Sequence, residues 1–230
     1  MRQKIITAVV LIASLALIVA CATVTTSVTD TRNSRTIKAE VWADNWFALY
    51  SGDTLVKEDS VPVTTERSFN SESFTFQASY PLQLNVVIKD YKANDTGLEY
   101  IGTPKQQMGD GGFIAQFTDV ATGKVIAVTN QNAKVMVIHK APLDKSCAKE
   151  SNPVAGRSTC AFTSMLEPTN WKSSSFDDST WSKASVFTAT EVRPKEGYLA
   201  ITWNPTAQFI WSSDLLLDNT VLVRINTAAP

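Results

Sequence analysis

The sequence contains one histidine, His139, and three cysteines among its 230 residues. Zinc and copper sites are normally built from several His and Cys ligands, so the composition argues against them. No G-x-S-x-G segment, which would place a serine nucleophile on a strand-to-helix turn, is present. Strand alternation puts His139 on the same side as Val135 and Val137, which favours a structural histidine. We therefore do not expect an enzyme that uses an imidazole base.

An excess of positive charge is also missing. The chain has 21 Lys and Arg residues against 22 Asp and Glu. Nucleic-acid binding requires a basic surface that displaces counterions, so we expect no nucleic-acid partner. No polybasic segment is available for anionic lipids either. Only one stretch, near the N-terminus, is long and apolar.

That stretch predicts a signal peptide over residues 1–20. Arg2 and Lys4 precede an apolar segment, and the small residue Ala20 suits signal peptidase cleavage. The run 17–21, Leu-Ile-Val-Ala-Cys, resembles the bacterial lipobox. The resemblance implies that Cys21 becomes the mature N-terminus and carries fatty acyl chains such as palmitate. An uncleaved anchor, or a plain signal peptide with a chance cysteine, is the alternative.

The residues after Cys21 bear on location and domain organisation. In bacterial lipoproteins an Asp directly after the cysteine favours the inner membrane, whereas Ala22 follows here. The resemblance thus implies the outer membrane, on its periplasmic or surface face. The Thr/Ser-rich residues 21–36 predict a flexible, lipidated tether. Residues 37–230 are expected to form a single domain.

The two remaining cysteines, Cys147 and Cys160, form a pair in an oxidising compartment. A bridge between them would close a short polar loop and contribute about 3 kcal/mol. A metal site on the two thiols is the alternative, but no Cys-x-x-Cys and no nearby His accompany them. We predict a structural disulfide.

Short alternating segments predict an all-β chain. No apolar period of 3.6 residues persists over three turns after the leader, and many short strands separated by turns favour an antiparallel β-sandwich or jelly roll. The segment 119–123 predicts a hairpin turn with Gly123 at positive φ. The strongest predicted strands cover residues 74–78, 82–88, 113–117, 124–129, 135–139, 199–203 and 221–225.

Two segments resemble galactose-binding-like β-sandwich domains. Residues 42–52, Trp-Ala-Asp-Asn-Trp-Phe-Ala-Leu-Tyr-Ser-Gly, are similar to the strand and turn "A-D-D/N-x-F-x-L-Y-x-N-G" of those domains. Residues 176–184, Phe-Asp-Asp-Ser-Thr-Trp-Ser-Lys-Ala, are similar to their "F-D-D-S-x-W…A" stretch. The two stretches occur in the reverse order here, and residues 60–150 have no counterpart. The resemblance implies a fold rather than an activity.

Asp177 and Asp178 are adjacent carboxylates within the second segment. On a strand they would point to opposite faces, so they are unsuited to flanking one glycosidic bond. On a turn they can cap backbone amides or contribute oxygens to a Ca²⁺ site. The related domains often hold a structural calcium, so Ca²⁺ is the one cofactor considered.

The segment 90–112 contains five of the nine glycines and is long for an ordered loop. Such a loop can simply connect two strands, or it can contact a ligand. Aromatic rings beside amide and carboxylate groups suit a sugar. The candidate contact residues are Trp46, Tyr50, Tyr100, Gln106, Gln107 and Asp110.

Three functions remain open from the sequence. The first is a membrane-anchored lipoprotein that binds a glycan outside the cytoplasm. The second is a structural or assembly lipoprotein that docks onto an envelope protein or an extracellular filament. The third is a hydrolase with two carboxylates brought together by folding. We expect a binding protein rather than an enzyme.

Overall fold

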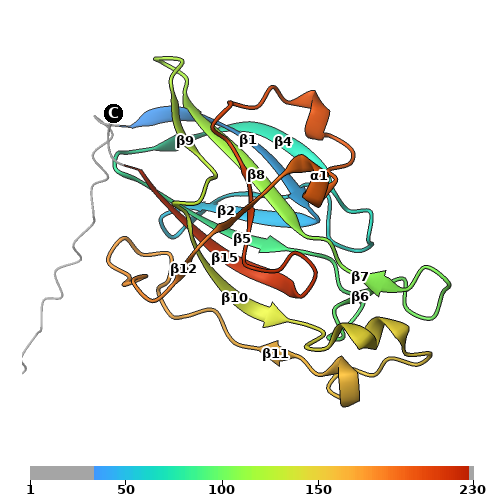
Figure 1. Ribbon diagram of the computed structural model, residues 1–230. Coiled ribbons are helices and arrows are strands. Elements are labelled where there is room, and N and C mark those ends of the chain that lie inside the picture. Colours follow the sequence, from blue (N-terminus) through green and yellow to red (C-terminus); the bar gives the residue numbers. More distant parts are fainter. Residues whose placement is uncertain (1–33, 228–230) are drawn as a thin grey trace, which may run out of the picture. The chain divides into compact units, whose positions relative to one another are not determined.

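The computed structural model describes residues 34–227, in which strands provide most of the regular secondary structure. Two antiparallel sheets pack face to face, which confirms the predicted β-sandwich (Figure 1). In spatial order, the first sheet contains β13 (Ser185–Phe187), β14 (Phe209–Trp211), β8 (Gly112–Asp119), β1 (Arg35–Asp44) and β4 (Asn70–Ala78), with β9 (Val125–Val128) paired to β8. The second contains β11 (Thr163–Ser164), β10 (Lys134–Lys140), β15 (Asp218–Thr227), β5 (Leu82–Lys89), β2 (Trp46–Ser51) and β3 (Thr54–Glu58), with β12 (Ser182–Lys183) paired to β10. A separate hairpin joins β6 (Leu98–Glu99) to β7 (Gln107–Met108).

The main core lies between the two sheets, because alternate side chains of each strand face inward. Alternate residues of β1, from Ile37 to Ala43, are almost fully buried there. Leu84 and Ile88 of β5 and Val223 of β15 meet them from the second sheet. Strand alternation in the sequence therefore identifies the inner face correctly.

The outer face of the second sheet is also covered. Asn85 and Val87, on this face of β5, are buried. Trp171 and Trp181 pack over this face, with their ring centroids 5.8 Å apart. The Asn85 side chain donates a hydrogen bond of 2.8 Å to the carbonyl oxygen of Lys172. The segment containing both tryptophans thus forms a third layer over β5.

The predicted hairpin between β8 and β9 is confirmed, with Gly123 at a φ of 67°. The prediction of a strand over residues 199–203 is wrong. Tyr198–Ala200 forms the 3₁₀ helix η4, after Gly197 adopts a φ of 85°. The ring of Trp203 stacks on Tyr198 instead of facing the sandwich core, and the Leu199 side chain is exposed. Alternating apolar residues in this segment therefore reflect local aromatic packing.

The other helical elements are short: η2 (Lys145–Lys149), η3 (Ser158–Cys160) and α1 (Ala189–Val192). A disulfide joins Cys147 to Cys160, which confirms the predicted pairing. His139 is buried, with its ring nitrogens 3.0 Å from Asn219 Oδ1 and 3.1 Å from Asp95 Oδ1. Within residues 34–227, no helix is long and apolar enough to span a membrane. The predicted signal peptide and Cys21 lie outside the described residues.

Candidate functional site

Two strands from different sheets end close together at one end of the sandwich. β1 of the first sheet ends at Asp44, and the chain crosses at Asn45 into β2 of the second sheet. The backbone N–H of Asn45 donates to the carbonyl oxygen of Lys89 at 2.8 Å, and Asp90 follows directly after β5. The side-chain oxygen of Asn45 accepts a hydrogen bond from the N–H of Tyr91. This crossing brings Asp44 and Asp90 close enough for their charges to interact.

Two further carboxylates reach the same place. Glu99 of β6 lies opposite Gln107 of β7, whose side-chain amide donates to Glu99 Oε2 at 2.8 Å. Asp110 precedes β8 in the glycine-rich segment. Oxygen atoms of Asp90, Glu99 and Asp110 all lie within 4.8 Å of one another. Together with Asp44, we call these residues the carboxylate cluster.

The carboxylate cluster is mostly buried. Asp44 is 1% exposed, Asp90 3% and Glu99 2%. Neither carboxylate oxygen of Asp44 or of Asp90 has a hydrogen-bond partner among the described residues. Lys195 Nζ lies 3.6 Å from Asp44 Oδ2 and 3.3 Å from Asp110 Oδ2. One ammonium group therefore faces four carboxyl groups, which would repel one another strongly if all were ionised.

Burial and mutual repulsion make Asp44, Asp90 and Glu99 hard to ionise. Burial, with the nearby charge of Asp110, raises the pKa of Asp44 to about 8. Burial also raises the pKa of Glu99 to about 7 and the pKa of Asp90 well above its ordinary value. For Lys195, burial opposes the charge, but the neighbouring carboxylates of Asp44 and Asp110 raise its pKa. Perturbed titration of several neighbours at one place is typical of functional sites.

The glycine-rich segment allows the backbone to approach this cluster closely. A Cβ atom on Gly109 would lie 1.8 Å from Asp90 Oδ2, so any side chain there would displace the carboxylate. A Cβ atom on Gly111 would lie 2.5 Å from the ring of the buried Trp211. Two of the glycines singled out in the sequence therefore serve close packing around Asp90 and Trp211.

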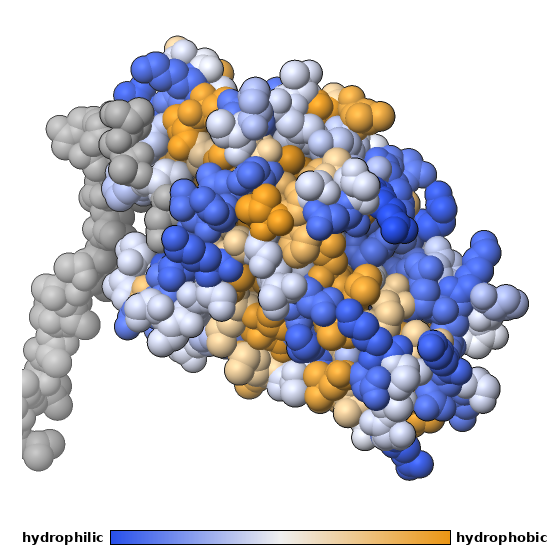
Figure 2. Space-filling view, in the orientation of Figure 1, coloured by the Kyte–Doolittle hydropathy of each residue, from blue (hydrophilic) through white to orange (hydrophobic). Residues whose placement is uncertain are grey.

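A cavity of about 400 Å³ opens beside the carboxylate cluster, and we call it the charged pocket. Glu99 and Asp110 line the charged pocket and also belong to the carboxylate cluster. Arg67 and Arg193 are exposed, and Lys195 Nζ lies 4.8 Å from the centre of the Phe69 ring. In Figure 2, hydrophilic residues gather over the end of the sandwich that carries the β6–β7 hairpin. The residues that line the charged pocket are Glu66, Arg67, Phe69, Glu99, Tyr100, Lys105, Gln107, Asp110, Arg193 and Lys195.

The structure gathers three of the predicted ligand contacts in the charged pocket: Tyr100, Gln107 and Asp110. Trp46 and Tyr50 lie elsewhere, on the covered outer face of the second sheet. Lys89 Nζ lies 4.4 Å from the centre of the Trp46 ring, and Lys172 Nζ lies 4.3 Å from that of Tyr50. Both rings are half-buried beneath these lysines.

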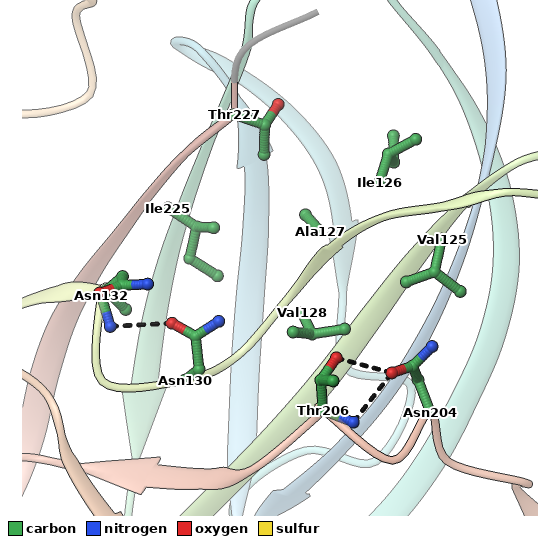
Figure 3. Close-up of a pocket in the computed structure, with 11 residues that line it drawn as sticks. Val125, Ile126, Ala127, Val128, Asn130, Asn132, Asn204, Thr206, Ile225 and Thr227 are labelled. Atoms are coloured by element: carbon green, nitrogen blue, oxygen red, sulfur yellow. Dashed lines mark hydrogen bonds between the residues drawn. The ribbon is translucent and has the colours of Figure 1, made fainter. Parts of the chain in front are cut away.

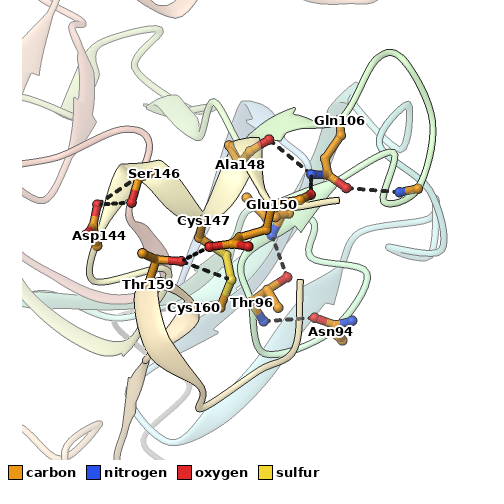
Figure 4. The surroundings of a disulfide bond; sticks show 12 residues. Asn94, Thr96, Gln106, Asp144, Ser146, Cys147, Ala148, Glu150, Thr159 and Cys160 are labelled. Atoms are coloured by element: carbon orange, nitrogen blue, oxygen red, sulfur yellow. Dashed lines mark hydrogen bonds between the residues drawn. A yellow bond between two sulfur atoms is a disulfide. The ribbon is translucent and has the colours of Figure 1, made fainter. Parts of the chain in front are cut away.

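Gln106 supports the hairpin from its other side. Its side-chain nitrogen donates to the carbonyl oxygens of Ala148 at 3.0 Å and Glu150 at 2.8 Å (Figure 4). These two residues belong to the loop stapled by the disulfide, whose sulfurs pack against Leu98 of β6. The disulfide loop thus buttresses the hairpin that carries Glu99.

Asp177 and Asp178 occupy separate structural roles. The Asp177 carboxylate accepts a hydrogen bond of 2.9 Å from the backbone N–H of Ser179, which is the turn-capping arrangement considered from the sequence. Asp178 Oδ2 accepts one of 2.8 Å from Nε of the buried Arg224. Among the described residues, the carboxylates gathered closely enough to share a cation are Asp90, Glu99 and Asp110.

A second cavity, of about 350 Å³, lies between β9 and the end of β15 (Figure 3). Aliphatic side chains of Val125 to Val128 and of Ile225 form much of its wall. Asn204 Oδ1 accepts hydrogen bonds from the backbone and hydroxyl of Thr206 at its rim. None of the described residues that line it has an ionisable side chain.

The sequence interpretation missed Asp44, Asp90, Glu99 and Lys195 as site residues. A partial signal exists for two of them: Asp44 and Asp90 end strongly apolar strand segments, where a charged residue begins a loop. Their proximity depends on which strands pair, and nothing local in the sequence encodes that. Comparison with known proteins finds no matching family model, no similar curated protein and no similar solved structure. The galactose-binding-like resemblance therefore stays a prediction.

Proposed function

We propose that this protein is an extracytoplasmic lipoprotein whose β-sandwich binds a saccharide in the charged pocket. The observation that carries the proposal is the convergence of Tyr100, Gln107 and Asp110 on one cavity of about 400 Å³. Ligand sites in proteins are concave and orient their ligand with a few convergent polar groups. The charged pocket fits that description, because it gathers three residues that the sequence predicts to contact a sugar.

The chemistry of the wall favours an acidic sugar. Gln107 and Glu66 offer amide and carboxylate groups that can pair with vicinal hydroxyls. Arg67 and Lys105 are exposed at the same cavity and can hold a carboxylate or sulfate group of the ligand. Tyr100 supplies ring surface for the apolar face of a sugar. We expect a uronic acid or a similar anionic saccharide to bind best.

The cellular location rests on the N-terminal sequence. The lipobox-like run ending at Cys21 supports anchoring by acyl chains on the thiol, and Ala22 favours the outer membrane. The disulfide between Cys147 and Cys160 agrees with an oxidising compartment. Both observations support a role outside the cytoplasm.

A glycan array that includes neutral, uronic-acid and sulfated saccharides tests the proposal. We expect anionic glycans to bind wild type, and Arg67→Ala and Lys105→Ala each to weaken binding about tenfold. Lys124→Ala, in the exposed β8–β9 turn, is the matched control and should bind as wild type does.

Three outcomes would contradict the proposal in different ways. No binding across the array would favour the assembly role. Binding abolished by Trp46→Ala but unchanged in Arg67→Ala would move the ligand to the outer face of the second sheet. Turnover of a bound glycan would indicate a hydrolase.

A further inference from the structure

We propose that Asp90, Glu99 and Asp110 bind a divalent cation, and that the ion which best fits their donor set is Ca²⁺. The proposal concerns the carboxylate cluster itself and does not depend on the charged pocket binding a saccharide. Nor does it depend on the resemblance to other β-sandwich domains, which placed calcium at Asp177 and Asp178.

The spacing of the three carboxylates fits one ion. Oxygen atoms on opposite sides of a bound Ca²⁺ lie about 4.8 Å apart, because each Ca–O bond measures about 2.4 Å. Ligand oxygens of Asp90, Glu99 and Asp110 all lie within 4.8 Å of one another. A single cation can therefore contact all three residues with small side-chain adjustments.

The second observation is independent of that spacing. Asp90 is 3% exposed, and both of its carboxylate oxygens lack a hydrogen-bond partner among the described residues. Buried polar groups in folded proteins are nearly always paired, and a buried carboxylate is especially costly without a partner. Asp90 points this unpaired carboxylate at Glu99 and Asp110, where repulsion would be greatest without a cation.

The ammonium group of Lys195 contacts two of the four carboxyl groups. Lys195 Nζ lies 3.3 Å from Asp110 and 3.6 Å from Asp44, and it forms no ion pair with Asp90 or Glu99. Asp44 is buried beside these groups and shares the Lys195 ammonium with Asp110, which leaves less of that charge for Asp90 and Glu99. A divalent ion supplies the missing charge and the missing partners together.

The donor set selects the class of metal. Every candidate ligand is a carboxylate oxygen, and oxygen ligands suit Ca²⁺ and Mg²⁺ rather than zinc or copper. The ligands come from the end of β5, from the β6–β7 hairpin and from the loop before β8. Such a variable arrangement suits the flexible geometry of Ca²⁺ better than the near-ideal octahedron of Mg²⁺.

Calorimetric titration of the EDTA-treated, metal-free full chain with CaCl₂ tests the proposal. We expect saturable binding of one ion, and a rise in the thermal unfolding midpoint of about 5 °C at a hundredfold excess over Kd. Asp90→Asn and Glu99→Gln keep the side-chain shape and should each raise Kd at least about tenfold. In EDTA, both variants should unfold at the wild-type temperature or above it, because each replaces a buried carboxyl group that resists ionisation with a neutral amide of the same shape.

Asp177→Asn is the matched control, since Asp177 is an acidic residue in an exposed turn away from the cluster. It should bind Ca²⁺ as wild type does. The proposal fails if wild type shows no saturable Ca²⁺ binding up to about 10 mM, weaker than extracellular calcium modules. It also fails if Asp90→Asn and Glu99→Gln bind as tightly as wild type, or if Mg²⁺ binds and Ca²⁺ does not. None of these results depends on a saccharide, so they leave the proposed function to its own test.

Discussion

Arg224 is a fully enclosed cation that connects β15 to the layer covering the second sheet. It is 2% exposed, and its Nε donates to Asp178 Oδ2 at 2.8 Å. Its other nitrogens donate to the carbonyl oxygens of Trp171 and Ser173. A guanidinium with this many fixed acceptors positions the covering segment as well as neutralising Asp178.

Arg224→Met should destabilise the fold by about 3 kcal/mol, because it leaves buried carbonyl groups and Asp178 without their partner. Urea denaturation measures the loss, and limited proteolysis should cut more readily near Trp171. Arg157→Met, at an exposed position, is the control and should change stability by less than about 0.5 kcal/mol. Equal stability of the two variants would show that Arg224 does not hold the layer.

Asp59 provides a titration that is separate from the carboxylate cluster. Burial, together with the nearby Glu72 charge, raises its pKa to about 6, although the backbone N–H of Val61 donates to it and opposes the shift. The folded state therefore binds a proton more tightly than the unfolded chain, whose carboxyl titrates near pH 4. The stability contributed by this group is present below pH 4 and is lost as the pH rises through 6.

Asp59→Asn should consequently gain stability over wild type between pH 4 and pH 6 and keep a constant advantage above that window. We expect about 1 kcal/mol, because solvent still screens part of the charge. Urea denaturation at pH 4.5 and pH 7.5 measures the difference. Asp53→Asn, at an exposed turn, should show no such pH-dependent gain. A constant difference at both pH values would exclude the assigned titration.

At the scale of elements, the disulfide loop and the β6–β7 hairpin form one unit. Cys147 and Cys160 pack with Leu98 of β6, and Gln106 bridges the two segments. The hairpin has only two residues in each strand, so its own ladder supplies little stability. The position of the hairpin therefore depends on the disulfide loop that packs against it.

Replacing both cysteines, as Cys147→Ser with Cys160→Ser, should lower the free energy of unfolding by about 3 kcal/mol. We also expect amide hydrogen exchange to accelerate at Leu98 and Met108, while β5 and β15 stay protected. Exchange detected by mass spectrometry provides both measurements, with the central strands as the internal control. Unchanged exchange in the hairpin would show that it stands without the disulfide loop.

Elements with a strong local signal could be predicted from the sequence. Alternation places the inner faces of β4 and β10, and Gly123 marks the β8–β9 turn. The same rule fails at Leu199, where a left-handed Gly197 and the packing of Trp203 produce a 3₁₀ turn. Alternation also fails to predict the burial of Val87, because the segment that covers this residue is remote in sequence. The pattern shows only whether a face of the strand is apolar.

The residues of the candidate site also divide into those that the sequence identifies and those that it does not. Tyr100, Gln107 and Asp110 could be identified because a long glycine-rich loop with polar and aromatic residues is unusual. Asp44, Glu99 and Lys195 could not, because they come together only where a strand crossing, a hairpin and the segment after α1 meet. A site whose residues are brought together by pairing between distant strands leaves no compact motif in the sequence.

For the whole molecule, the predicted N-terminal lipid is the testable feature. Cys21→Ser should move the protein from the detergent-extractable membrane fraction to the soluble fraction, because a serine cannot carry the thioether-linked lipid of lipoproteins. Ala22→Asp should keep the lipid and, as the lipobox resemblance implies, shift the protein to the inner membrane. Fractionation and mass spectrometry of the mature N-terminus check both. Unchanged partitioning of Cys21→Ser would contradict lipid anchoring.

The direction of β1 sets the distance between the two ends of the sandwich. The strand begins at Arg35 and ends at Asp44, so ten residues, about 30 Å of extended chain, separate the start of the strand from the carboxylate cluster (Figure 1). The carboxylate cluster therefore lies at the end of the sandwich opposite the residue at which β1 begins. A bulky ligand can contact that end without contacting Arg35.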